Sequence, residues 1–209
     1  MCVSGETRIQ TRGGCPKITD VLETVVNVWD GKAWVPTSPF ESRRNKHLYR
    51  VTLSDGSYLD CTSDHVWFVK SRHVGCFTKF RHVKTADLKA GDQLKTFSMS
   101  KPCDDGVENL KVDVFSDNVY HLNKASMTFF LLDQEFKEHT EEVARGLQLL
   151  FRRVRLDNRM VHEELHGPWR IRVGDGSQHV LNVMRLDGLH TVYETECGSC
   201  VFNNCLTKS

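Results

Sequence analysis

Cysteine and histidine are the residue types of this sequence best suited to breaking a peptide bond. Cys2 directly follows the peptide bond of Met1, so its thiolate could attack the Met1 carbonyl and form a thioester. A free thiol with a pKa of about 8.5 is mostly protonated at neutral pH, and it therefore needs a base for its proton. The leaving nitrogen needs an acid. Histidine, with an ordinary pKa of about 6.5, suits this proton exchange.

The sequence has eight cysteines, and the only two that lie close together are those of Cys197-Gly-Ser-Cys200. This pair could be a redox couple or half of a zinc site. A zinc site needs four ligands, and no second Cys-x-x-Cys exists in the sequence. Without a secretory signal a disulfide framework is also disfavoured. We therefore expect plain strand cysteines, no metal and no cofactor.

The composition is that of an ordinary globular protein. The chain has 209 residues, 39% hydrophobic and 26% charged, and a net charge of +1. This charge gives no reason to expect nucleic acid or a membrane as the main partner. No apolar run approaches the roughly 20 residues that span a bilayer, and the opening residues are unlike a signal peptide. We expect a soluble, cytoplasmic protein.

Short segments of β-branched and aromatic residues dominate the two ends of the chain and must position the reactive residues. Asp30-Gly31 and Asp55-Gly56 between such segments predict hairpins, because these turns need a positive φ. The strands that we predict cover residues 25–29, 48–53, 58–61, 66–69, 93–97, 180–183 and 191–193.

The middle of the chain has a different pattern. The pattern of short β-strand segments ends near residues 101–106. From Thr140 the apolar residues recur with the 3.6-residue period of a helix. Val143, Leu147, Leu150 and Val154 form one apolar stripe, with Thr140 as the expected N-cap. The sequence therefore predicts a mixed α+β segment inserted into an all-β domain.

Three separated segments resemble inteins, in the right order. Residues 2–9 (Cys-Val-Ser-Gly-Glu-Thr-Arg-Ile) are similar to an intein start, and residues 61–65 (Cys-Thr-Ser-Asp-His) contain the Thr-x-x-His block. Residues 192–197 resemble the Val-Tyr-Asp strand, with Glu194 where Asp is usual. The tail at 201–207 resembles the closing strand, most of all in inteins of ribonucleotide reductases.

This resemblance implies a fold and a division of the chain. The fold is the all-β Hint horseshoe with pseudo-two-fold halves, formed by residues 2–100 and 179–209. Residues 101–178 are then a small α+β insert. Within it, residues 146–154 resemble a helix of LAGLIDADG homing endonucleases, but the acidic motifs that would bind divalent cations are absent. The insert is therefore interpreted as a degenerate endonuclease remnant, and the chain as a mini-intein.

The resemblance also assigns roles in self-excision. It implies that Cys2 attacks, that His65 protonates the nitrogen after Met1, and that Thr62 hydrogen-bonds the same peptide. Glu194 matches an acidic residue that assists the first acyl shift. A carboxylate beside a thiol takes its proton only if burial raises the pKa of the carboxylate.

The end of the chain departs from the family pattern. Aligning residues 202–204 with the usual Phe-Asn-Gly puts Ser209 at the terminal position and Lys208 before it. The family has Asn or Gln at the terminal position, because the side-chain amide cyclises to release the chain, and His before it. Serine has no amide, so this register predicts a blocked last step. In a second register the junction lies at Asn204-Cys205, an asparagine followed by a thiol.

Other functions stay open. A cleavage-only Hint domain, of the hedgehog or bacterial-toxin type, needs no terminal Asn. A nucleic-acid-binding module could use Arg145, Arg152, Arg153 and Arg155, although neighbouring acidic residues favour a solvated helix face. A plain structural β domain is the third alternative. In the intein interpretation the partners are flanking host segments in cis, with no obligatory nucleic acid, no membrane and a monomeric chain.

Overall fold

The computed structural model describes residues 2–71, 78–97, 109–113, 119–123, 135–138, 148, 158–162, 169–173 and 177–208. The chain divides into two units. The first unit consists of Met1–Phe97 together with Ser177–Ser209, and the second of Ser98–Gly176. The sequence segments at both ends of the chain thus form one body.

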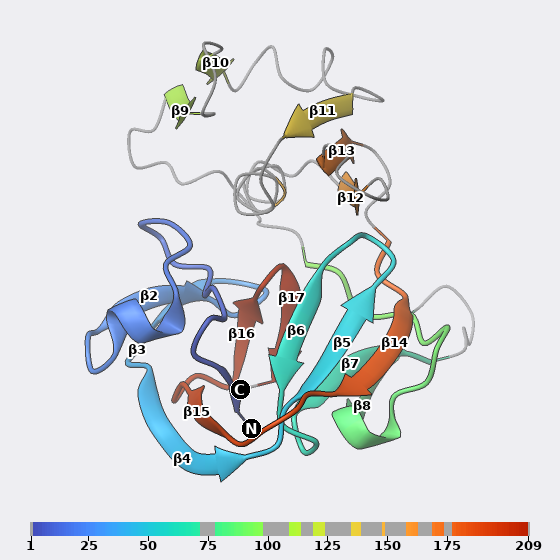
Figure 1. Ribbon diagram of the computed structural model, residues 1–209. Helices are drawn as coiled ribbons and strands as arrows, with labels where there is room; N and C mark the ends of the chain where they lie inside the picture. Colours follow the sequence, from blue (N-terminus) through green and yellow to red (C-terminus); the bar gives the residue numbers. More distant parts are fainter. Residues whose placement is uncertain are drawn as a thin grey trace. The chain divides into compact units, whose positions relative to one another are not determined.

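Antiparallel strands build the first unit (Figure 1). Its largest sheet has the order β14-β5-β6-β1-β15-β4, a second has the order β16-β17-β7-β8, and β2 pairs with β3. Short 3-10 helices cover Ile18–Val21 and Thr85–Asp87. The strands are β1 (Val3–Ser4), β2 (Val26–Trp29), β3 (Trp34–Thr37), β4 (Phe40–Lys46), β5 (Tyr49–Leu53), β6 (Tyr58–Cys61), β7 (Val66–Lys70), β8 (Phe80–Lys84), β14 (Val180–Arg185), β15 (His190–Glu194), β16 (Ser199–Phe202) and β17 (Cys205–Lys208).

Both predicted hairpins are confirmed. Asp55-Gly56 joins β5 to β6, where Thr52 pairs with Tyr58, and Gly56 has a φ of +83°. Asp30-Gly31 joins β2 to β3, and the Asp30 carboxylate accepts two backbone N–H groups of the turn at 2.7 Å. Gly31 has a φ of +96°, and a Cβ there would lie 2.9 Å from Leu206. Only glycine fits this position.

The first strand pairs with β6 and the last strand pairs with β7, so both ends of the chain lie near the segment between β6 and β7 (Figure 1). β1 lies between β6 and β15, with Val3 opposite Cys61 and Tyr193. β17 pairs with β7 at Thr207 and Trp67. Residues 62–65 connect β6 to β7, so they lie beside both ends.

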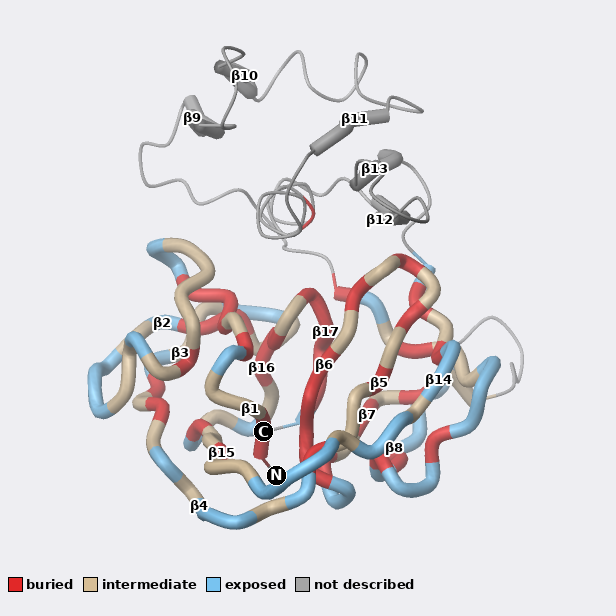
Figure 2. Tube along the Cα trace, viewed as in Figure 1, coloured by how far each residue is buried: buried red, intermediate tan, exposed pale blue. Residues whose placement is uncertain are grey.

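Large apolar side chains hold the strands of the first unit together. Trp67, Phe202, Ile9 and Leu59 are fully buried in one core cluster. Figure 2 shows the burial along β6, β16 and β17, whose residues are buried at three of four positions each. A fully buried aliphatic or aromatic side chain stabilises by roughly 1.5–3 kcal/mol, so this core fixes the backbone around residues 62–65.

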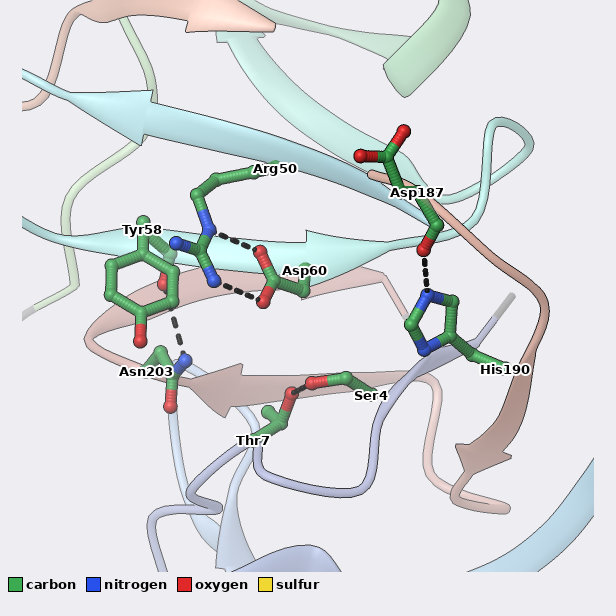
Figure 3. A network of polar contacts seen from close by, with 8 residues as sticks. All are labelled: Ser4, Thr7, Arg50, Tyr58, Asp60, Asp187, His190 and Asn203. Carbon is green, nitrogen blue, oxygen red and sulfur yellow. Dashed lines mark hydrogen bonds and ion pairs between the residues drawn. The ribbon is translucent and has the colours of Figure 1, made fainter. Parts of the chain in front are cut away.

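A polar contact next to the core fixes the register of β5 and β6 (Figure 3). Arg50 and Asp60 lie opposite each other and make a two-pronged ion pair, with both N–O distances at 2.7 Å. The guanidinium also stacks 4.1 Å from the centre of the Tyr58 ring. A one-residue slip would break this pair and turn Leu59 out of the core.

Several elements differ from the prediction. β4 has the sequence Phe-Glu-Ser-Arg-Arg-Asn-Lys, without an apolar alternation, and it is a strand because it pairs with β15 along the edge of the sheet. Residues 93–97 are not a strand: Gln93 and Leu94 make only isolated bridges, to His179 and Val69. Edge pairing is a long-range effect that local sequence patterns do not contain.

The second unit contains two small sheets in its described parts. β9 (Asn109–Asp113) pairs with β10 (Val119–Asn123), and β13 (Trp169–Val173) lies between β11 (Glu135–Glu138) and β12 (Asn158–His162). The predicted apolar stripe lies outside the described residues; within its span only Gln148 is described, and it is helical. Among the described residues, no helix is long and apolar enough to cross a membrane.

Candidate active site

Hydrogen bonds across β1 and the β6–β7 connection hold the backbone of Cys2 against Thr62. The N–H of Cys2, which belongs to the Met1–Cys2 peptide bond, donates to the Thr62 hydroxyl at 3.2 Å. The N–H of Thr62 donates to the Cys2 carbonyl at 3.0 Å. Because these contacts clamp both sides of Cys2, Thr62 lies directly on the bond that the sequence singles out.

The thiol of Cys2 faces a carboxylate and a hydroxyl. Its Sγ lies 3.3 Å from Glu194 Oε2 and 3.5 Å from Ser42 Oγ. An ionised carboxylate only accepts hydrogen bonds, so the thiol can donate to Glu194, and the Ser42 hydroxyl hydrogen-bonds the same carboxylate. Burial raises the pKa of the Cys2 thiol, Ser42 lowers it, and Glu194 raises it further. The resting thiol is therefore protonated.

The pKa of Glu194 is lowered overall. Burial raises it, but hydrogen bonds from the chain's amino group and from the Cys2 thiol lower it by more. The condition set from sequence, a pKa raised by burial, is thus not met in this chain. A polypeptide fused ahead of Met1 has no amino group there. In such a fusion the pKa of Glu194 is no longer lowered by the amino group, which is the largest lowering cause, so burial raises this pKa against fewer lowering contacts.

His65 is held in a turn and enclosed by aromatic side chains. Its N–H donates to the Thr62 carbonyl at 3.0 Å, and its carbonyl accepts from Thr85 at 2.8 Å. The ring lies 5.9 Å from Trp67 and 6.4 Å from Phe202, centre to centre. It is completely buried, and burial is the main cause that lowers its pKa to about 3. The imidazole is therefore neutral at pH 7.

Both ring nitrogens of His65 are without a hydrogen-bond partner in the described part of the chain. Buried polar atoms in native proteins are nearly always hydrogen-bonded, and an unmet one costs about 1–3 kcal/mol. An unmet group of this kind needs a physical explanation, and proton transfer in a reaction is one such explanation for an imidazole. His65 is accordingly the strongest candidate for proton transfer in the first unit.

The two proposed junctions at the other end of the chain lie in different places. Lys208 ends β17 and is exposed, beyond the pair Thr207–Trp67, whereas Ser209 is outside the described residues. Asn204 lies at the other end of β17, in the two-residue turn between Phe202 and Cys205. Asn203 and Asn204 have φ values of +44° and +67°, as this type of hairpin turn requires.

The side chains of Asn204 and Cys205 are fixed in the interior. The Asn204 amide donates to Asp55 at 3.2 Å and to Ser57 at 3.0 Å, and both partners are buried. Cys205 belongs to the core cluster. β17 has four residues, which span about 10 Å at the usual rise of a strand, so this turn lies that far along β17 from Lys208.

The cysteine pair after Glu194 differs from the expectation. Cys197 and Cys200 form a disulfide, not two free strand cysteines. The Thr195 hydroxyl contacts both sulfurs, at 2.9 and 3.3 Å. Their spacing was visible in the sequence, but the tight turn that brings the two Cα atoms to 6.8 Å depends on the fold. Among the residues described here, no three His, Cys, Asp or Glu side chains are grouped to hold a metal ion.

Two residues of the site carried no sequence signal. Ser42 lies on the charged edge strand β4, which no periodicity predicted. Thr85 follows β8, and its hydroxyl contacts the His65 carbonyl, the Cys61 thiol and the Trp67 indole N–H at 3.2, 3.2 and 2.9 Å. Both are small hydroxyl residues that act through long-range contacts, and only the folded structure reveals those contacts.

Comparison with known proteins identifies the fold. A DnaB intein from Synechocystis sp. PCC 6803 superposes with a TM-score of 0.50, at 10% identity, over all of this chain and 97% of the intein. A G-1F mutant of the Ssp DnaB mini-intein variant M86 gives the same TM-score and identity, over all of this chain and 98% of that one. The chain therefore has the all-β Hint fold of inteins, as the sequence predicted.

The sequence comparisons are more limited. No family model matches the chain. Over 87 residues it is 31% identical to the ribonucleoside-diphosphate reductase large subunit of Invertebrate iridescent virus 6. This stretch is 42% of the present chain but only 9% of the reductase. The similarity thus concerns a small part of that protein.

Proposed function

We propose that the chain is a protein-splicing element, an intein, whose first reaction is an acyl shift from the Cys2 nitrogen to the Cys2 sulfur. The observation that supports this most is the arrangement at Cys2: its thiol contacts Glu194, and its peptide nitrogen donates to Thr62. The intein fold and the match to a short part of a reductase support the same function. The host in this proposal is a ribonucleotide reductase.

The acyl shift requires one proton to move from sulfur to nitrogen. Glu194 takes the thiol proton, and the thiolate attacks the carbonyl carbon of Met1. The bond between that carbon and the Cys2 nitrogen then breaks, and the nitrogen leaves as an amine that gains a proton. His65 passes this proton on. A buried imidazolium with a pKa of about 3 is a strong acid, so once formed it readily protonates the departing nitrogen.

We further propose that the first junction register applies, with Lys208 and Ser209 at the downstream end. The hydrogen bonds of Asn204 to Asp55 and Ser57 support this register, because they hold both amide N–H groups away from the Asn204 carbonyl. With serine at the terminal position, no side-chain amide is present to cyclise. The last step is then blocked, and only the upstream reaction proceeds.

The remaining parts of the proposal concern the partners of the chain, its location and the role of the second unit. Flanking host segments in cis are the only required partners, and the chain works as a monomer in the cytoplasm. The second unit is a degenerate LAGLIDADG remnant without endonuclease activity. The arginines considered for nucleic-acid binding (Arg145, Arg152, Arg153 and Arg155) lie outside the described residues.

A fusion with two carrier proteins tests the function. One carrier precedes Met1, the other follows Ser209, and dithiothreitol is added. We expect intact-mass measurements to show release of the upstream carrier by thiol exchange, with the downstream carrier retained. Cleavage between Asn204 and Cys205 would establish the second register. Release of the upstream carrier even after Ser209→Asn with Cys behind it, without cleavage or ligation downstream, would favour a cleavage-only Hint domain.

A further inference from the structure

A cavity of about 390 Å³ lies directly beside the reactive thiol. β4, the loop that follows it and the turn after β6 contribute its walls. The residues that line it are Cys2, Arg43, Lys46, His47, Tyr49, Thr62, Ser63 and Asp64. The acyl shift described above uses only Cys2 and Thr62 of this set, so the function of the other side chains is open.

The charged side chains of this cavity do not balance. Arg43 and Lys46 make no ion pair with any described residue. Asp64 is the only carboxylate in the lining. Burial raises the pKa of Asp64, but its hydrogen bond with Thr62 and nearby positive charges, Arg43 among them, lower it by more. Two cations therefore face one ionised carboxylate, which is already hydrogen-bonded.

His47 adds no acidic group to the lining. One of its ring nitrogens lies 2.9 Å from the guanidinium of Arg185, which can only donate, and the other lies 3.2 Å from the carbonyl of Gly188. The residues that line the cavity thus carry a net positive charge, supplied by Arg43 and Lys46 of β4, while the Glu194 carboxylate contacts the Cys2 thiol and is not part of the lining. The β4 side of the cavity suits an anionic group.

Covalent continuity limits what can occupy the cavity. Cys2 forms part of the wall, and an extended residue spans only about 3.3–3.6 Å. A polypeptide joined ahead of Met1 therefore reaches the cavity with its nearest residues, at an effective concentration that a free ligand rarely attains.

We propose that this cavity binds a carboxylate side chain, Asp or Glu, of the host segment immediately ahead of Met1. Arg43 and Lys46 are then specificity residues for the upstream flank. This inference rests on the proposed function and names the substrate class of the same site. Seating the acidic side chain holds the Met1 carbonyl against the Cys2 thiol, so the effect falls on the rate of the acyl shift. Partly exposed ion pairs predict about a two- to five-fold effect.

Three matched flanks test this inference. The residue before Met1 is Glu, Gln or Lys in an otherwise identical upstream fusion, and thiol-dependent release is followed by intact mass. We expect the rate to fall in the order Glu, Gln, Lys, by about two- to five-fold at each step. The double charge reversal Arg43→Glu with Lys46→Glu should invert the order. In 1 M salt, where the screening length is about 3 Å, the differences should shrink.

Arg44→Glu is the matched control. Arg44 lies on the same strand and has the same charge, but it pairs with Glu41 and does not line the cavity. This variant should preserve the order of the three flanks. Equal rates for all three flanks, with release still dependent on Cys2, would overturn the inference and leave the proposed function intact. Slowing by inorganic phosphate, equal for all flanks, would instead indicate a site for a free anion and would also overturn it.

A second measurement does not depend on the reaction. In an uncleaved Cys2→Ala fusion with a labelled flank Glu, NMR titration gives the pKa of that side chain. We expect a pKa several tenths below the usual value of about 4.3, restored by Arg43→Glu with Lys46→Glu. An unshifted pKa would show that the cavity does not bind the flank, whether or not the chain splices.

Discussion

Glu194 and Asp55 are both carboxylates that accept a hydrogen bond from a residue with splicing chemistry. Glu194 faces the thiol of Cys2 at 3.3 Å, and Asp55 faces the amide of Asn204 at 3.2 Å. The sequence places Cys2 at the upstream junction, and the second of its two downstream registers places Asn204 at the other junction. Their surroundings distinguish them.

Neutral donors surround Asp55 on several sides. It accepts the backbone N–H of Ser57 at 3.0 Å and the side-chain amide of Gln178 at 2.8 Å, besides Asn204. Gln178 also donates to the Asn204 carbonyl at 2.7 Å. Such a network stabilises one arrangement of the turn. Around Glu194, by contrast, the donors include the Cys2 thiol and the chain's amino group besides the Ser42 hydroxyl, and the first two can give up a proton. The same residue types thus serve structure in one place and chemistry in the other.

The largest expected effect is a contrast between two buried cysteines. Cys2→Ala should abolish thiol-dependent release of an upstream carrier, because the attacking atom is removed. Cys205→Ala should keep release, because this thiol lies in the core cluster, where it donates to the Asn203 carbonyl at 3.5 Å, and the proposed acyl shift does not use it. Intact mass after incubation with dithiothreitol measures both. Loss of release in a folded Cys205→Ala chain would mean that the turn at Asn204 belongs to the reaction after all.

The next effect concerns proton transfer at the upstream end. His65→Ala should slow release by about 10²- to 10⁴-fold, as expected for lost general acid–base help. His82→Ala, an exposed histidine on β8, is the control and should leave the rate unchanged. Because removing a buried ring also leaves a cavity, His65→Gln and a melting curve accompany the test. A folded His65 variant with the original rate would assign the proton to another group.

Local sequence patterns were sufficient to predict the hairpins and the candidate site residues. They were not sufficient to predict how the surroundings of Glu194 and Asp55 differ. Asp55-Gly56 indicates a turn because its glycine needs a positive φ, and Thr62 and His65 share one block. That Asn204 is a turn residue follows from the pairing of β16 with β17, and Ser42 reaches Cys2 through an edge strand with no apolar period. These are non-local pairings, and their free energy is distributed over residues far apart in the chain.

Removing each carboxylate in turn tests whether Asp55 serves stability and Glu194 serves the reaction. Asp55→Ala removes the acceptor of three neutral donors and should lower the free energy of unfolding by about 3 kcal/mol, with little effect on the release rate of the folded fraction. Glu194→Ala should do the reverse, slowing release while changing stability less, since this side chain is partly exposed. Urea unfolding and release kinetics on both variants measure the pair. If both variants lost stability and rate equally, the contrast drawn here would be wrong.

The smallest expected effect is a dependence of stability on pH that only the upstream site has. His65 has its pKa lowered by burial from 6.5 to about 3, so between these values the unfolded chain binds a proton that the folded chain does not. Stability from this group is complete above pH 6.5 and is lost as the pH falls toward 3. At pH 5 the loss is about 2 kcal/mol, at 1.36 kcal/mol per pH unit.

The carboxylates of the chain also make its stability depend on pH, and the control is therefore His65→Gln, which cannot titrate. Urea unfolding at pH 7 and pH 5 should show the gap between the two chains narrow by about 2 kcal/mol at the lower pH. A constant gap would mean that His65 binds its proton equally well in the folded and the unfolded chain, so that burial does not lower its pKa.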